Sequence, residues 1–140
     1  MTKFQVLVKS STFKFFIAVF VAANIFTVCS VSTASLSDVR LCAGVNSSSE
    51  CDADKSTFPE DVSVIYCSAK VKNAPSNTKV TFTWKYESES LGSADVETSS
   101  GIVYSTYKSP GRTLKPGKYS VTAKINTDNS DPVTKNFTVE

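Results

Sequence analysis

The sequence contains no histidine. Histidine is the commonest general base in enzymes and the commonest ligand of protein-bound zinc, so its absence narrows the acid–base and metal chemistry open to the chain. Catalysis or metal binding would have to rely on carboxylates and thiols. We therefore expect a protein that is not an enzyme and that holds no metal ion and no cofactor.

A stripe of positive charge is also missing. The formal net charge is +2 at pH 7, but residues 1–34 contain three lysines and no acidic residue, so the remaining 106 or so residues carry about −1. Proteins that bind nucleic acid concentrate lysine and arginine on one face. The composition therefore argues against a nucleic-acid partner.

A long apolar run occurs only near the N-terminus. A positively charged segment precedes it, Phe15–Val28 is almost entirely apolar, and small side chains follow at Ser32 and Ala34. This is the pattern of a secretory signal helix with a cleavage site after Ala34. The sequence thus predicts a signal peptide at residues 1–34 and a secreted protein, periplasmic or extracellular.

An uncleaved membrane anchor is the alternative. Residues 15–34 would span roughly 30 Å as a helix, which matches the apolar thickness of a bilayer. Polar residues dilute the second half of this segment, which favours cleavage. A membrane is expected as a partner only if the segment is retained.

Beyond residue 34 the sequence shows the alternation of β-strands. In Val80–Tyr86 the side chains of Val80, Phe82, Trp84 and Tyr86 fall on one face of an extended chain, and polar side chains fall on the other. Trp84, the only tryptophan, is therefore expected in the core. Further strands are predicted at residues 38–45, 62–72, 102–107, 119–125 and 133–139.

Two other stretches complete the predicted fold. Residues 87–101 are rich in Ser, Glu and Gly, so we expect a solvated connection with at most a short edge strand at 95–98. Alternation in residues 62–72 predicts an inward set (Ile65, Cys67, Ala69, Val71) and an outward set (Tyr66, Ser68, Lys70, Lys72). Together these patterns predict an all-β, antiparallel sandwich of about seven strands.

Three cysteines follow the predicted cleavage site. In an oxidising compartment, Cys42, Cys51 and Cys67 would give one disulfide and one leftover thiol, with three possible pairings. Cys67 lies among the predicted inward side chains and resembles a small buried apolar residue. Cys42 and Cys51 flank a Gly, Asn and Ser-rich stretch that a short disulfide would close, so this pairing is favoured.

Acidic side chains offer no convincing site. Asp52, Asp54 and Ser56 have the alternating oxygen ligands that begin a calcium loop, but a threonine and a serine stand where that loop requires glycine and glutamate. Glu87 and Glu89 share the wet face of a Ser-rich connection, and nothing in the pattern buries them. No catalytic, cofactor-binding or metal-binding residue is predicted.

The sandwich resembles the immunoglobulin fold at two motifs. Trp84 stands where that fold keeps the tryptophan of strand C, and Gly117–Val121 is similar to its tyrosine corner, with Tyr119 as the tyrosine. Antibody-type domains place their second core cysteine at the position of Val121, so their disulfide is absent here although Cys67 occupies the first position.

The pattern is therefore similar to small secreted bacterial immunoglobulin-like (Ig-like) proteins with no assigned activity. The residues that carry this likeness are Phe58, Ile65, Tyr66, Asn73, Ala74, Pro75, Thr78, Trp84, Pro116, Gly117, Lys118, Tyr119, Phe137, Thr138 and Val139. The resemblance implies a single Ig-like domain at residues 35–140, and such a fold implies no chemistry by itself.

An Ig-like sandwich would bring two polar loops, residues 72–78 and 126–132, to the same end. Their candidate recognition residues are Asn73, Asn77, Asn126, Asp128 and Asn129. We expect a binding or structural module of the cell envelope that recognises a protein or glycan through these loops or through an exposed sheet edge. A membrane-anchored display domain and a small secreted hydrolase are the alternatives.

Overall fold

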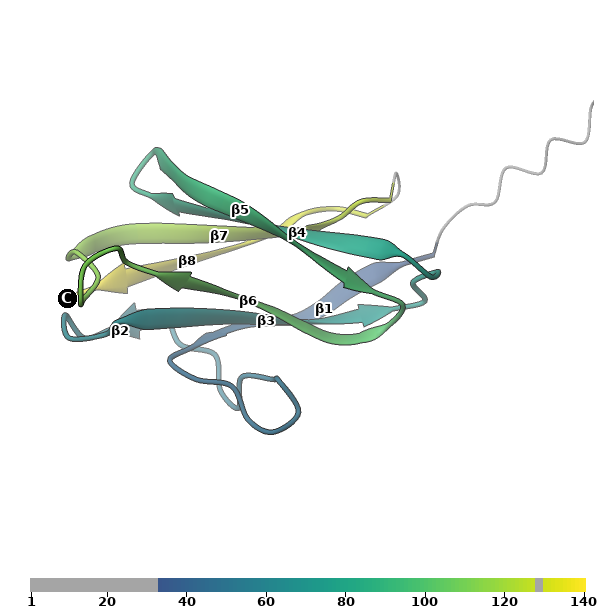
Figure 1. The fold of residues 1–140 in the computed structure, drawn as a ribbon, viewed down its shortest axis with the longest axis horizontal. Coiled ribbons are helices and arrows are strands. Elements are labelled where there is room, and N and C mark those ends of the chain that lie inside the picture. The colour runs from purple at the N-terminus through teal and green to yellow at the C-terminus, as the bar shows by residue number, and fades with distance from the viewer. Residues whose placement is uncertain (1–32, 128–129) are drawn as a thin grey trace, which may run out of the picture. The chain divides into compact units, whose positions relative to one another are not determined.

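The structure is a computed structural model that describes residues 33–127 and 130–140. Two β-sheets pack face to face in this part of the chain (Figure 1), which confirms the all-β sandwich. The strands are β1 (Ser35–Cys42), β2 (Thr57–Phe58), β3 (Val64–Lys72), β4 (Thr78–Tyr86), β5 (Glu89–Thr98), β6 (Gly101–Lys108), β7 (Gly117–Ile125) and β8 (Val133–Val139). The predicted signal peptide lies almost entirely outside the described residues.

The strand order is that of the immunoglobulin fold. One sheet has the order β1-β3-β6 and the other has the order β2-β8-β7-β4-β5. Neighbouring strands are antiparallel, except that β2 runs parallel to β8. The tryptophan strand β4 thus takes the position of strand C, and β7 takes that of strand F.

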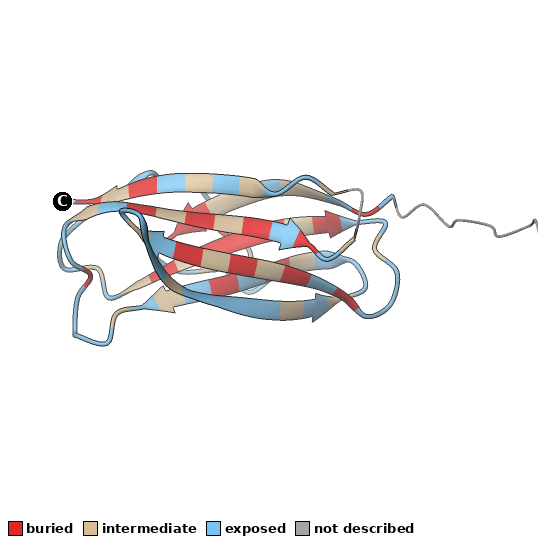
Figure 2. Ribbon diagram, turned by 90° about the horizontal axis from the view of Figure 1, so that it is seen from above, coloured by how far each residue is buried: buried red, intermediate tan, exposed pale blue. Residues whose placement is uncertain are grey.

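Trp84 lies at the centre of the core, as the alternation predicts. Its side chain is 3% exposed, and its indole N–H donates a hydrogen bond to the Ser105 hydroxyl on the opposite sheet at 3.2 Å. Its ring meets Phe137 edge-on, with 6.4 Å between centroids. Figure 2 shows buried residues alternating with more exposed ones along the strands that enclose this core.

The tyrosine corner is present at the start of β7. The Tyr119 hydroxyl donates a hydrogen bond to the Lys115 carbonyl oxygen at 2.8 Å, and its ring stacks on Phe137 with 5.1 Å between centroids. Gly117 precedes it at a φ of 142°, and a Cβ there would lie 2.8 Å from the Tyr86 ring. Only glycine fits this close approach.

The edge strand expected at 95–98 is present, but the expectation that the rest of residues 87–101 forms a solvated connection is wrong. β5 is a ten-residue strand that pairs along the whole of β4, with a bulge beside Trp84. Glu87 takes a φ of 52° in the tight turn between the two strands, a conformation that asparagine or glycine usually signals. Most side chains of β5 are exposed on both faces, so no apolar alternation marks the strand.

The first strands also differ from expectation. β1 begins at Ser35 and ends at Cys42, earlier than the predicted 38–45, and a register shift between Ser37 and Arg40 interrupts its alternation. The two-residue strand β2 was not predicted. Ala34 is 4% exposed and belongs to the core, so packing begins one residue before the predicted domain boundary.

Removing the Tyr119 hydroxyl tests the corner. We expect Tyr119→Phe to lower the free energy of unfolding by about 1 kcal/mol, because the substitution deletes one hydrogen bond in a part-buried site. Tyr86→Phe is the matched control, since that hydroxyl donates to the Pro116 carbonyl in an exposed position. Urea denaturation measures both, and equal losses would contradict the assigned role of Tyr119.

Candidate functional site

A disulfide holds a loop against the outer face of the three-stranded sheet. Cys42 and Cys51 are bonded, the pairing favoured from the sequence, and Cys51 is fully buried. Its backbone N–H donates a hydrogen bond to the Ser68 hydroxyl at 3.0 Å. Ser68, expected to face solvent, is therefore buried beneath this loop, which Figure 1 shows below β3.

Charged side chains hold the same loop in place. The Glu50 carboxylate lies 3.2 Å from the Lys70 amine and 3.7 Å from the Arg40 guanidinium, and Lys70 also lies 3.3 Å from Asp38. Hydrogen bonds to Glu50, and then to Asp38, raise the pKa of Lys70. Each pair is partly exposed and contributes little to stability alone, so the cluster orients the loop.

The end of the loop covers the free edge of β1 at Leu41. Leu41 donates its backbone N–H to the Asp54 carboxylate at 2.9 Å and accepts a hydrogen bond from the Lys55 N–H at 2.9 Å. Asp54 also forms an ion pair with Lys135. Exposed strand edges invite pairing with other chains, and these contacts occupy the edge of β1 at Leu41.

The acidic residues of the calcium loop that the sequence suggested form hydrogen bonds and ion pairs within the protein. Asp54 is held as described, and the Asp52 carboxylate accepts a hydrogen bond from the Asn46 amide at 2.8 Å. Within residues 33–127 and 130–140, no three potential metal ligands among His, Cys, Asp and Glu converge.

Cys67 is a free thiol in the core between the sheets. Burial, reinforced by the charge of Asp54, raises the pKa of Cys67 to about 12. The thiolate is the reactive form of cysteine, so this thiol is inert at physiological pH.

Asn126, at the start of the second polar end loop, contacts β4 just after the first end loop. The Asn126 side chain accepts the Lys79 N–H at 2.9 Å, and the Asn126 N–H donates to the Lys79 carbonyl at 2.9 Å. Asn73 and Asn77 take φ angles of 55° and 63° in the turn between β3 and β4. Asparagine tolerates this left-handed conformation, so these three candidates have structural roles.

Asp128 and Asn129 lie outside the described residues, so they do not enter the geometry of this end. Recognition by the end loops therefore stays a prediction.

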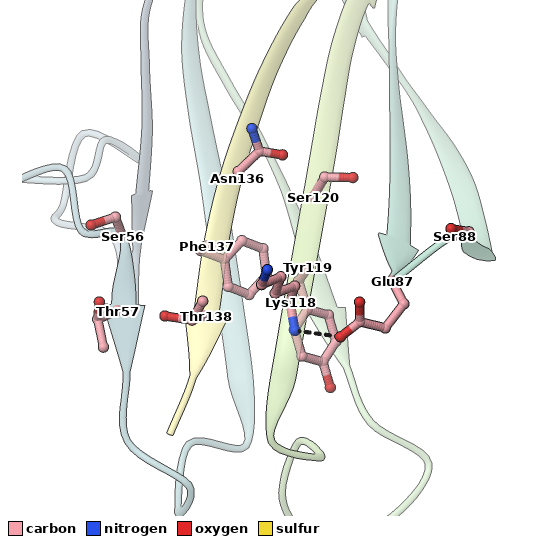
Figure 3. Close-up of a pocket in the computed structure, with 10 residues that line it drawn as sticks. All are labelled: Ser56, Thr57, Glu87, Ser88, Lys118, Tyr119, Ser120, Asn136, Phe137 and Thr138. Carbon is pink, nitrogen blue, oxygen red and sulfur yellow. Dashed lines mark hydrogen bonds between the residues drawn. The ribbon is translucent and has the colours of Figure 1, made fainter.

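A shallow hollow of about 540 Å³ opens on the outer face of the five-stranded sheet (Figure 3). Its lining residues are Ser56, Thr57, Glu87, Ser88, Lys118, Tyr119, Ser120, Asn136, Phe137 and Thr138. The Glu87 carboxylate accepts a hydrogen bond from the Lys118 backbone N–H at 3.0 Å. The hollow offers hydroxyl and amide groups for hydrogen bonding but buries no charge.

A second cavity, here called the edge cavity, lies between the end of β6 and the turn from β4 to β5. It has a volume of about 450 Å³ and is lined by Tyr86, Glu89, Leu91, Tyr107, Ser109, Pro110, Gly111, Thr113, Lys115 and Tyr119. The rings of Tyr86 and Tyr119 lie 4.8 Å apart, and those of Tyr107 and Tyr119 lie 6.4 Å apart. Burial, and then the neighbouring tyrosines, raise the pKa of Tyr119.

The edge cavity was not predicted from the sequence. Glu87 and Glu89, considered as a carboxylate pair, line different hollows, since Glu87 lines the outer-face hollow and Glu89 the edge cavity. The three tyrosines come from three strands in two sheets, and only the tertiary fold brings them together. Tyr86 and Tyr119 could be placed in the core from their strand phases, but Tyr107 gave no sign of joining them.

Comparisons with known proteins concern the fold alone. No protein-family model and no curated protein matches the sequence. The chain is similar to a solved immunoglobulin-like protein from Pseudomonas aeruginosa, with a TM-score of 0.47 and 11% identity over 74% of this chain and 98% of that chain. In this molecule the strand order and the tyrosine corner establish the Ig-like sandwich.

Two findings bear on location. The disulfide is typical of oxidising compartments outside the cytoplasm. Within the described part of the chain, no helix has the length and apolarity needed to span a bilayer. The alternative anchor at residues 15–34 falls almost wholly outside that part.

The buried thiol predicts a labelling pattern. Because the pKa of Cys67 is raised to about 12, iodoacetamide should leave Cys67 unmodified in the folded protein at both pH 7 and pH 9. In denaturant at pH 9 it should react fully. Peptide mass spectrometry resolves the site, and rapid native labelling of Cys67 would contradict its burial.

Removing the disulfide should destabilise the domain. The bond closes a short loop, with a sequence separation of 9, and the chain-entropy model assigns such a closure about 2.5 kcal/mol. We expect the Cys42→Ser, Cys51→Ser double variant to lose about this much in urea denaturation. The variant should also be cut by protease within residues 43–56. An unchanged cleavage pattern would contradict the conclusion that the disulfide holds this loop against the sheet.

Proposed function

We propose that the chain is an extracytoplasmic module that acts by recognition and not by catalysis. One observation carries this proposal: β5 is the edge strand of the five-stranded sheet, and most of its side chains are exposed. Opposite residues of an antiparallel pair share a face, so Gly92 and Ala94 lie on the same face as their partners Trp84 and Phe82.

The exposure of these residues differs sharply along that face. Trp84 and Phe82 are 3% and 0% exposed, whereas Gly92 and Ala94 are exposed. The inner face of β5 is therefore open at Gly92 and Ala94, whereas Val96 on the same face packs partly against the core. Among the described residues, no strand pairs with the outer edge of β5. Native proteins usually cover or blunt such an edge, and an uncovered strand beside a packed core is a surface suited to binding another molecule.

Three features support a role without catalysis. Glu87 and Glu89 line separate hollows. Cys67 is buried, and its raised pKa of about 12 is unfavourable for a nucleophile. Both hollows have hydroxyl-rich linings suited to hydrogen bonding with a surface partner.

The N-terminal pattern and the disulfide support a place outside the cytoplasm. Cleavage after Ala34 would release the module into the periplasm or the medium. Retention of residues 15–34 would display the same module on a membrane. Either arrangement would leave the module accessible to a protein or glycan of the cell surface.

Fractionation of the producing cell tests this proposal. We expect the natural chain outside the cytoplasm, with Cys42 and Cys51 oxidised and, by intact mass, without residues 1–34. Cross-linking on intact cells should then recover a surface protein or glycan. A cytoplasmic chain with Cys42 and Cys51 reduced would overturn the extracytoplasmic role.

A further inference from the structure

Two free strand edges lie on the same side of the sandwich. β6 ends the three-stranded sheet and β5 ends the five-stranded sheet. Figure 1 shows them meeting at the short turn between them and diverging from it. Among the described residues, no strand pairs with the outer edge of either one. The two edges therefore form the sides of a wedge.

The edge cavity lies where the wedge is open. β5 contributes Glu89 and Leu91 to its lining, β6 contributes Tyr107, and β4 and β7 contribute Tyr86 and Tyr119. The cavity thus joins an aromatic surface to two unpaired strand edges. Backbone hydrogen bonding and a side-chain pocket are the two elements by which a sheet edge binds an extended peptide.

Space for an added strand exists next to β6. The inward face of β5 carries the small residues Gly92 and Ala94, both exposed, and a Cβ built at Gly92 would meet no atom within 4 Å. A strand added to β6 would continue the three-stranded sheet and face these residues across the usual spacing of about 10 Å between packed sheets. Small residues on β5 leave room for its side chains.

The outer face of β6 also suits an added strand. Tyr104 is 41% exposed there, and its ring lies 6.0 Å from that of Tyr66. An outward side chain of the incoming strand would be the cross-strand neighbour of Tyr104. Aromatic and β-branched neighbours stabilise such pairs.

The charge of β5 indicates which kind of partner fits the wedge. β5 carries Glu89, Asp95 and Glu97 and no basic residue. Asp95 accepts a hydrogen bond from the Thr81 hydroxyl at 2.7 Å, and Glu97 lies 3.9 Å from the Lys79 amine. The Glu89 side chain lines the edge cavity and makes no hydrogen bond or ion pair with another side chain of the described residues. Its carboxylate is therefore available to a cation.

We infer that the wedge binds an extended segment of another protein as an added strand on β6. The segment inserts an apolar side chain into the edge cavity and places a lysine or arginine against Glu89. This inference rests on the proposed function and names its site and its class of partner. A second copy pairing through β5 is disfavoured, because like charges would face each other.

Selection from a phage-displayed library of random twelve-residue peptides tests the inference, with the purified chain in the form that the cell produces as bait. We expect enriched peptides to alternate polar and apolar residues, with a basic residue two positions from an aromatic or aliphatic one. Hydrogen exchange should show new protection at the amides of residues 103–107 when the peptide binds. Failure to enrich this pattern would overturn the inference.

Matched variants identify the site. Glu89→Gln should weaken the selected peptide about tenfold, the effect of losing one charge-assisted hydrogen bond, while Glu97→Gln on the same strand should leave affinity unchanged. Ala94→Phe should fill the wedge and abolish binding, whereas Ser93→Phe, on the opposite face of β5, should not.

The outcomes separate this inference from the proposed function. If Glu89→Gln and Ala94→Phe leave peptide affinity unchanged but substitutions in the end loops reduce it, the wedge is not the binding site. That result would overturn the inference but not the proposed role in recognition. A dimer in sedimentation that Ala94→Phe dissociates would make a second copy the occupant, which also overturns the inference.

Discussion

Burial of Trp84 is the interaction on which the rest of the sandwich depends. The indole fills the space between the sheets and needs a partner for its N–H, which Ser105 on β6 supplies across the core. Cys67, the partner of Ser105 in the β3–β6 ladder, is a small residue of the same core. The ring also contacts Phe137, which stacks on Tyr119, so the tyrosine corner and the tryptophan share one aromatic cluster.

The two sheets around Trp84 have different numbers of strands, and the two sides of the molecule therefore differ. On one side, the disulfide loop covers β1 through Asp54 and Lys55, and β2 extends the larger sheet beside β8. On the other side, β5 and β6 have no such cover among the described residues. A disulfide and a loop of charged contacts thus close one edge, while the opposite side keeps two edges open beside an aromatic cavity.

The predictable part of the structure is the part in which each strand has one dry face. Alternation located β3, β4, β7 and β8 to within about two residues because their inward side chains pack on the core. It located only residues 95–98 of β5, because Gly92 and Ala94 on the inner face of that strand are exposed. The burial of Ser68 was also predicted wrongly. Its hydrogen-bond partner Cys51 belongs to a loop, and strand periodicity gives no information about which loop covers a strand.

The candidate site depends on contacts that no single segment contains. Tyr86 and Tyr119 are direct partners in the β4–β7 ladder, and Tyr107 joins them from β6 in the other sheet. The end loops differ in this respect. Their asparagines could be identified from the sequence, but in the structure they stabilise the turns. Asn126 is committed to the backbone of Lys79, whereas the carboxylate of Glu89, a lining residue of the edge cavity, has no side-chain partner among the described residues. Groups that the fold leaves unsatisfied are better placed for recognition than groups that the fold already uses, and this difference favours the open side of the sandwich over its end.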